Sequence, residues 1–185
     1  RLTAPEWLAK GWNGYILGTD SVGRDILTRL LMGGSYSLMI AGIVTCTVCV
    51  IGVVLGMIAG YFGVVVDMVL MRICDVVNSI PDLLLAIVVV SMFGTGISNL
   101  ILVLCFCLWP SFARLTRNNV LVMRNKEFVK ASEALGAKDF FIMFKEILSN
   151  VSTPLLIQFS QMIAKVIRTE ASLSFLDLGV PPPNP

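Results

Sequence analysis

The sequence predicts an all-α membrane protein, a polytopic bundle of helices, and three observations lead to that prediction. Of its 185 residues, 56% are hydrophobic and only 14% are charged, whereas roughly 25% of residues are charged in a typical soluble domain. The apolar residues form blocks, because no charge occurs between residues 29 and 67, 82 and 114, or 146 and 165. Crossing the hydrocarbon core takes about 20 mostly apolar residues, and these blocks have no polar face that would cover them in water.

The blocks contain four candidate spans, at about 36–60, 68–94, 97–116 and 147–171. The basic residues between Ser111 and Glu146 are Arg114, Arg117, Arg124, Lys126, Lys130, Lys138 and Lys145. Because loops rich in lysine and arginine tend to stay in the cytoplasm, we expect the loop 117–146 on that side.

Three parts of the chain follow from this orientation. Residues 1–35 form an outer segment, residues 36–175 the transmembrane domain, and residues 176–185 an outer loop after which the chain is expected to be incomplete. The turn at 94–98 is also expected outside, and the short loop at 61–66 inside.

The outer segment is expected to contain an interfacial amphipathic helix that leads into the first span. Trp7 and Trp12 favour the membrane interface, and Thr19 or Asp20 can cap the helix. Because the chain begins without methionine, we expect it to be a piece of a longer protein.

The first span carries Gly52, Gly56 and Gly60 at intervals of four residues. Repeated small residues at this spacing allow a second helix to approach closely, which is how helices pack in lipid. The pattern therefore predicts an internal packing seam, and the span is expected to end in a tight turn at Gly63.

The second span is unusual because it contains ionisable residues. Arg72, Asp75, Ser79 and Asp82 follow one another at intervals of 3, 4 and 3 residues, which predicts that they share one helix face. Pro81 lacks a backbone donor and is expected to kink the helix. Such residues usually face a protein interior or a water-filled path. Alternatively, Arg72 and Asp75 simply pair with each other at the cytoplasmic end.

The third span reaches the cytoplasmic interface at Trp109 and Pro110, and its helix is expected to continue through Arg114 and Arg117. In the fourth span, Lys165 either extends to the membrane surface or faces a central path.

The cytoplasmic loop contains a short polar helix, residues 127–137, with an apolar stripe formed by Phe128, Ala131 and Leu135. Gly136 lies where a helix usually ends, and Asp139 is expected to cap the next helix. Such an element can be moved by a partner that lies outside the membrane.

No catalytic or metal-binding residues are assigned. The chain has no Gly-x4-Gly-Lys-Ser/Thr loop and no histidine, which excludes that nucleotide site and the His-dependent triads and metal motifs. Cys46 and Cys49 could share a helix face as metal ligands, but small apolar residues in a helix interior are the simpler interpretation. No basic stretch is interleaved with aromatic residues, so no nucleic acid is expected as a partner.

Five segments resemble those of the permease subunits of bacterial ABC-type importers of the dipeptide, oligopeptide and nickel class, the binding-protein-dependent transport inner-membrane components. They are residues 127–137, which resemble the family's cytoplasmic coupling motif, and residues 17–25, 71–75, 109–110 and 169–176. The resemblance covers nearly the whole chain. It departs from the family's pattern at Ser149, where proline is common, at Ser132, where a second alanine is common, and at Lys165, which is unusually polar.

The resemblance implies a type I ABC importer permease, with four spans visible of an expected six, in a bacterial inner membrane. A second, homologous permease subunit would complete a heterodimer, two cytoplasmic ATPase subunits would bind ATP and Mg, and an external binding protein would deliver peptides, or nickel or related small solutes. This chain would bind no cofactor and catalyse no reaction. The residues that would couple it to the ATPases are Glu127, Phe128, Lys130, Ala131, Ser132, Glu133, Ala134, Leu135, Gly136 and Ala137.

Arg72, Asp75, Ser79, Asp82 and Lys165 are the candidate pathway residues. An alternative function is a secondary transporter or channel that needs no ATPase and uses the intramembrane Arg and Asp residues as an ion or proton relay. No inverted repeat is evident across the spans, although many secondary transporters carry one.

Overall fold

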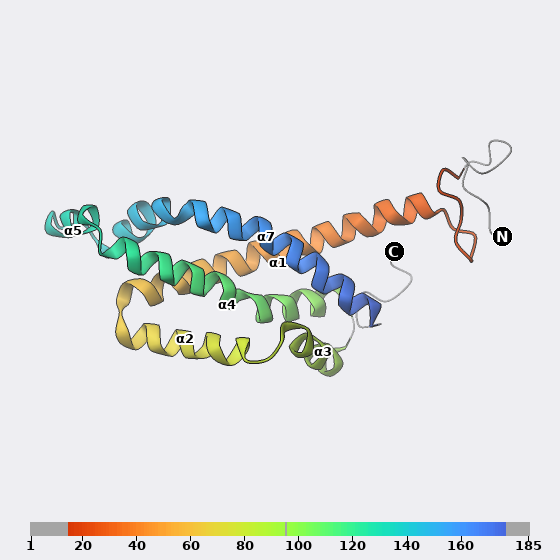
Figure 1. Ribbon diagram of the computed structural model, residues 1–185, viewed down its shortest axis with the longest axis horizontal. Helices are drawn as coiled ribbons and strands as arrows, with labels where there is room; N and C mark the ends of the chain where they lie inside the picture. Colours follow the sequence, from red (N-terminus) through yellow and green to blue (C-terminus); the bar gives the residue numbers. More distant parts are fainter. Residues whose placement is uncertain (1–14, 95, 177–185) are drawn as a thin grey trace.

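The computed structural model describes residues 15–94 and 96–176, and this part of the chain is helical throughout its regular structure (Figure 1). The elements are α1 (Ile26–Phe62), α2 (Val64–Asn78), α3 (Asp82–Phe93), α4 (Ile97–Arg124), α5 (Glu127–Ala134), α6 (Asp139–Phe141), the π-helix η1 (Ile142–Ile147) and α7 (Leu148–Phe175). The predicted all-α fold is confirmed. The positions predicted for Trp7 and Trp12 lie outside the described residues, as do those of 177–185.

Three helical stretches of the described chain are long and apolar enough to cross a membrane: α1, α4 and the run Asp139–Phe175. The pair α2 and α3 makes a fourth if the two bent helices count as one span. The number agrees with the four predicted spans, but the helices begin well before the predicted bounds at α1, which starts at Ile26, and at the last run, which starts at Asp139.

The beginning of α1 differs from the prediction. Among the described residues, which start at residue 15, no separate interfacial helix precedes the first span, because α1 is one continuous helix of 37 residues. Its cap is Asp25 rather than Thr19 or Asp20: the Asp25 carboxylate accepts from the backbone N–H groups of Leu27 and Thr28, both at 3.2 Å. Asp25 immediately precedes the helix, and only there can a short side chain reach these unpaired donors.

Asp20 instead holds together the loop that precedes α1. Its carboxylate accepts from the backbone N–H groups of Arg24 and Val22, both at 2.9 Å, and forms ion pairs with Arg24 at 3.1 Å and Arg29 at 2.7 Å. The Arg24 backbone N–H first of all, together with the Val22 N–H and the Arg24 side chain, lowers the pKa of Asp20 well below its usual range.

This pKa predicts an unusual resistance of the loop to acid. A carboxylate whose pKa is lowered by folding stabilises the fold above its ordinary value of about 3.9 and loses that contribution only as the pH falls through the lower, folded-state value. Hydrogen-exchange protection of the Val22 and Arg24 amides, corrected for intrinsic rates, should therefore persist at about pH 3. Asp20→Asn should lose the protection at every pH. A loss in the native chain centred near pH 4 would contradict the prediction.

The packing seam predicted on α1 is confirmed, and its partner is α4. A Cβ atom built on Gly52 would lie 2.4 Å from the Phe112 Cβ, and one on Gly56 would lie 2.4 Å from the carbonyl oxygen of Ala113. At Gly60 the corresponding distance to the Val120 Cβ is 2.8 Å. The backbones of the two helices are thus in direct contact, and α1 and α4 form the most extensive helix pair of the bundle.

The second predicted span is broken rather than kinked. The axes of α2 and α3 differ by 82°, because Pro81 has an extended backbone and cannot supply the N–H that would continue the helix. The prediction of one polar face is therefore wrong: Arg72 and Asp75 lie on α2, Ser79 is its C-cap, and Asp82 begins α3.

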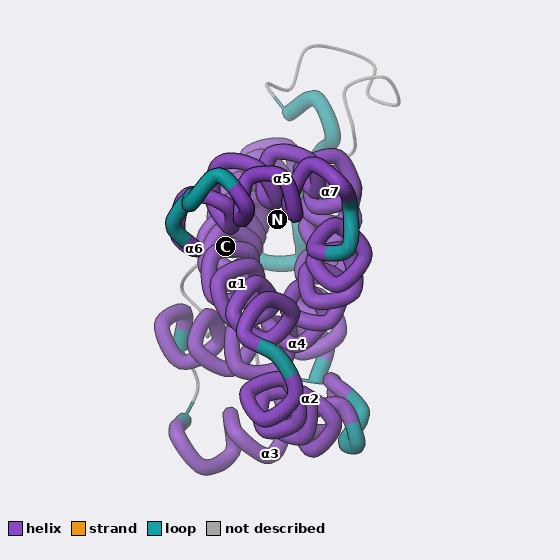
Figure 2. Tube along the Cα trace, turned by 90° about the vertical axis from the view of Figure 1, so that its left-hand side faces the viewer, coloured by secondary structure: helices purple, strands orange, loops and turns teal. Residues whose placement is uncertain are grey.

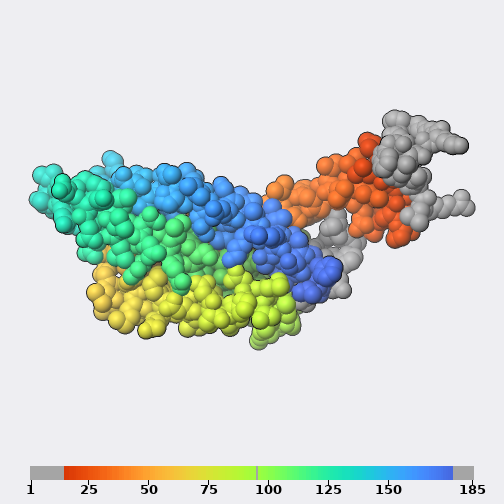
Figure 3. Space-filling view, viewed as in Figure 1, coloured from red at the N-terminus to blue at the C-terminus, as the bar shows by residue number. Residues whose placement is uncertain are grey.

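The last helical run is continuous from α6 through η1 into α7, with Pro154 inside α7. Viewed along the bundle, α1, α4 and α7 lie together and α2 and α3 lie on one side (Figure 2). The first part of α1 projects beyond the rest of the molecule (Figure 3).

The two ends of the bundle carry different connections. The α1–α2 turn, where Gly63 has a positive φ of 92°, lies at the same end as α5 and the end of α4 (Figure 1). The α3–α4 connection and the end of α7 lie at the other end. This is the alternation that the predicted orientation requires.

Candidate functional site

The short helix α5 turns its apolar stripe away from the bundle. Leu135 is 88% exposed and Phe128 is 40% exposed, and Ala131 is exposed between them. The residue that α5 buries is Val129, which joins the hydrophobic core. Sequence reasoning missed Val129, although a β-branched apolar residue off the predicted stripe was a usable signal.

The end of α5 has the glycine stop that the sequence predicts. Gly136 adopts a left-handed φ of 81°. The N–H of Ala137 donates to the carbonyl of Ser132 and the N–H of Gly136 to that of Glu133, both at 3.0 Å. This pair of bonds is the Schellman motif, which satisfies the last free carbonyls of a helix and reverses the chain.

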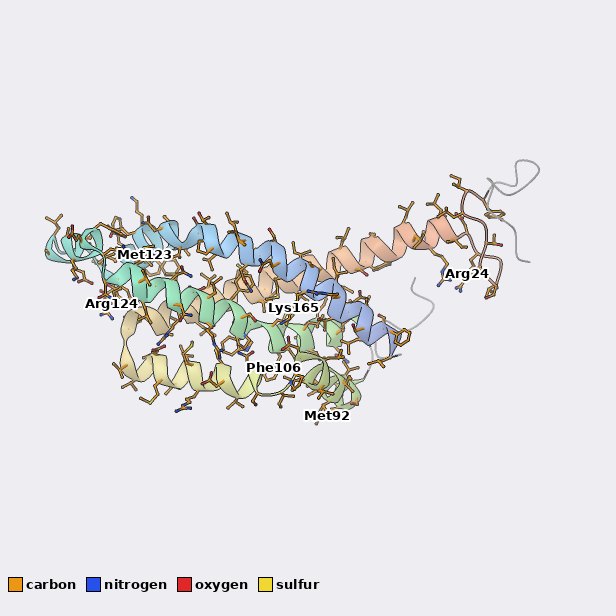
Figure 4. All side chains as sticks on the ribbon, viewed as in Figure 1. Arg24, Met92, Phe106, Met123, Arg124 and Lys165 are labelled. Carbon is orange, nitrogen blue, oxygen red and sulfur yellow. The ribbon has the colours of Figure 1, made fainter. Side chains whose placement is uncertain are left out.

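Two side-chain hydrogen bonds connect the α5 region to the bundle. Ser132 donates its hydroxyl proton to Glu146 Oε1 of η1 at 2.5 Å, so the serine that replaces the family's common alanine adds a contact. The Tyr61 hydroxyl at the end of α1 donates to Asp139 Oδ1 at 2.8 Å, and the Arg124 guanidinium lies 5.2 Å above the Tyr61 ring. Figure 4 shows Arg124 at this end of the molecule.

The expected capping role of Asp139 is wrong. Lys138 occupies the cap position, and no side chain caps α6 there. Asp139 is already the first residue of the helix, so its carboxylate extends sideways and reaches the tyrosine of α1 instead. This hydrogen bond connects the start of the last helical run to the first span, and its two residues are 78 positions apart in the chain.

The acidic residues of α2 pair with arginines of α4. Asp75 pairs with Arg114 at 2.8 Å, so the predicted pair between Arg72 and Asp75 does not form. Asp67 pairs with Arg117, both partly buried. Neither arginine was considered as a partner of α2 from the sequence, because nothing local indicates which helix faces the basic side of α4.

The Asp82 carboxylate and the Lys165 ammonium form a further pair, with 2.5 Å between Oδ2 and Nζ. It joins the start of α3 to the middle of α7, where Figure 4 labels Lys165. Both side chains are about one-third exposed, at 31% and 38%, and they line a recess of about 310 Å³. Lys165 therefore faces this recess. Ser79 stands apart and bonds only its own helix, at Val76.

The five cysteines are free thiols. Within residues 15–94 and 96–176, no group of three or more His, Cys, Asp or Glu side chains is arranged to hold a metal ion.

Comparison with known proteins gives one consistent result. Residues 52–185 match the family described as the binding-protein-dependent transport system inner membrane component. The chain is 44% identical, over 94% of its length, to the glutathione transport system permease protein GsiD of Pectobacterium atrosepticum. It is 39% identical over its full length to the dipeptide transport system permease protein DppC of Haemophilus influenzae, and 37% to the di/tripeptide transport system permease protein DppC of Pseudomonas aeruginosa. It spans 58%, 62% and 61% of these three relatives.

Proposed function

Since the chain belongs to the family of binding-protein-dependent transport system inner membrane components, we propose that it forms half of the translocation pathway of an ATP-driven importer in a bacterial inner membrane. A second, homologous permease supplies the other half, two ATPase subunits dock in the cytoplasm, and an external binding protein delivers the cargo. The chain itself catalyses nothing, and ATP and Mg bind to the ATPases.

The geometry of α5 is the observation that carries this proposal. The helix presents Phe128, Ala131 and Leu135 to its surroundings, and burying such apolar surface favours association with a partner. Its other side is held to the bundle by Val129 and by the Ser132–Glu146 bond. A partner that moves this helix must therefore also move η1, and with it α7.

The charged residues around the stripe set the register of docking in this proposal. Glu127, Lys130 and Glu133 are all exposed, and charges at the rim of an interface contribute mainly to orientation and specificity. The small residues Ala134 and Ala137, with Gly136, permit a close approach of the ATPase at the end of the helix.

Peptides are the proposed cargo. The relatives named above are permeases of glutathione, dipeptide and di/tripeptide transport systems, which favours a peptide over nickel. The ion pairs of Asp75 and Asp82 also argue for fixed positions of these carboxylates, rather than for the exchange of protons that a relay in an ATPase-independent transporter would need.

The exposed leucine of α5 provides the test. Leu135→Asp in the complete transporter should reduce ATPase copurification and ATP-dependent peptide uptake at least tenfold. The fold should survive, because Leu135 makes little contact within the chain. Binding of the purified ATPase subunits to the reconstituted permeases measures the effect on docking directly.

Val64→Asp is the matched control for this substitution. Val64 is 78% exposed and begins α2 at the same end of the molecule, but it lies outside α5. The control should dock and transport normally. Equal loss in both variants, or uptake that persists without any ATPase and collapses with an ion gradient, would refute the proposed function.

A further inference from the structure

The recess beside the Asp82–Lys165 pair has a lining suited to a charged solute. It lies between the start of α3 and the last third of α7, and its walls are formed by Asp82, Leu83, Lys165, Arg168, Thr169 and Ser172. A second recess continues from it toward the end of α7, sharing Leu83, Arg168 and Ser172. Five of the six residues that line the first recess carry polar or charged side chains.

The charges of this lining do not balance. Lys165 is paired with Asp82, whereas Arg168 has no carboxylate partner among the described residues and is exposed one turn further along α7. Two cations therefore face one anion. A charged side chain within a span is costly unless it meets water or a counter-charge, so the recess favours an anionic group at Arg168.

The two hydroxyl groups of the recess are already engaged as donors. Thr169 donates its proton to the carbonyl of Lys165 at 3.0 Å, and Ser172 donates to that of Arg168 at 2.9 Å. Their oxygens can then only accept. A planar guanidinium matches a carboxylate through two parallel N–H bonds, and the remaining acceptors, including Asp82, suit an ammonium group.

We propose that this recess is a subsite for a zwitterionic peptide in transit, in which Arg168 binds the free carboxylate of the cargo. Lys165 adds positive charge, and Asp82, whose Oδ2 stays paired with Lys165, attracts the ammonium group through its other carboxylate oxygen. The proposal rests on the proposed function, since it is the cargo of that importer which enters the recess. Arg168 lies about two turns from the end of α7, on the side where the external binding protein delivers its cargo.

Thiol protection in the complete transporter tests the subsite without requiring transport. A Ser172→Cys reporter, in nanodiscs of phosphatidylcholine and without binding protein, is reacted with a membrane-impermeant thiosulfonate, and the parent chain gives the background from the native thiols. Millimolar alanyl-alanine should slow the modification severalfold. Alanyl-alanine amide, which lacks the carboxylate, should not. Leu83→Cys, on the opposite wall, is a second reporter with the same expectation.

Arg168→Gln should abolish the protection in both reporters, whereas Arg24→Gln, at the far outer end of the molecule (Figure 4), should leave it intact. Equal protection by the amide, or none by the free acid, would overturn the subsite. A phosphate of a lipid headgroup could also bind the guanidinium. If phosphatidylglycerol in the nanodisc protects the thiol and alanyl-alanine adds nothing, the recess is a lipid site and the proposal fails.

Parallel assays in vesicles separate this proposal from the function on which it rests. ATP-dependent uptake of a peptide by the native transporter, with its binding protein, tests the proposed importer function. Uptake without carboxylate-dependent protection refutes only the subsite, and absence of uptake by the native complex refutes the function.

Discussion

Gly56→Ala is expected to separate α1 from α4 and to cost about 3 kcal/mol or more of stability, at the upper end of the range for overpacked cores. The added methyl group would lie 2.4 Å from the carbonyl oxygen of Ala113 and 2.7 Å from the Thr116 Cβ. The first of these atoms belongs to the backbone of α4, so relief requires a shift of the whole helix. Because helices in lipid associate through such close packing, most of the purified permease should aggregate or unfold at a lower temperature. Thermal unfolding in detergent, followed by size-exclusion chromatography, measures both effects.

Gly42→Ala is the matched control, and its predicted effect has the opposite sign. Gly42 lies on the same helix, but no atom is within 4 Å of its added Cβ. Alanine favours a helix over glycine by about 1 kcal/mol, so this variant should be as stable as the native chain or more stable. If the two substitutions destabilise the protein equally, the seam does not hold α1 against α4.

Gly136→Val is expected to uncouple ATP hydrolysis from transport while leaving the bundle folded. A β-branched residue at the φ of 81° is strained by about 2 kcal/mol, which is enough to shift the equilibrium between this turn and its alternatives roughly thirtyfold. The Schellman bonds of Ser132 and Glu133 would then open, and α5 would no longer have a fixed direction relative to η1. Peptide uptake per ATP hydrolysed by the reconstituted transporter should fall at least tenfold.

Asparagine at the same position distinguishes backbone conformation from the loss of glycine as such. It tolerates the left-handed region better than other residues with a side chain, and no atom lies within 4 Å of the Cβ that it would add. Gly136→Asn should therefore retain most of the coupling. Normal uptake and normal ATPase docking in the valine variant would contradict the role assigned to this turn.

Local patterns predicted those parts of the candidate site that depend on neighbours within a turn or two. The apolar stripe of α5, its glycine stop and the disturbance of the helix at Pro81 all follow from helix periodicity and backbone chemistry, although Pro81 breaks the helix where a kink was predicted. The shared polar face, its alternative of a pair between Arg72 and Asp75, and the cap at Asp139 were wrong. Asp75, Asp82 and Asp139 instead find their partners on other helices, at Arg114, Lys165 and Tyr61.

By itself, the sequence determined that this is a helical membrane protein, that α1 has a face which admits a close helix, and that a short helix with a glycine end stands between two spans. Only the tertiary structure decided which charges meet. Asp75 and Arg114 are 39 residues apart, Asp67 and Arg117 are 50 apart, and Tyr61 and Asp139 are 78 apart. Such pairs depend on how neighbouring helices are rotated and aligned. That alignment is set by the packing of α1 on α4 and by the direction in which α3 leaves Pro81. Local sequence patterns do not predict it.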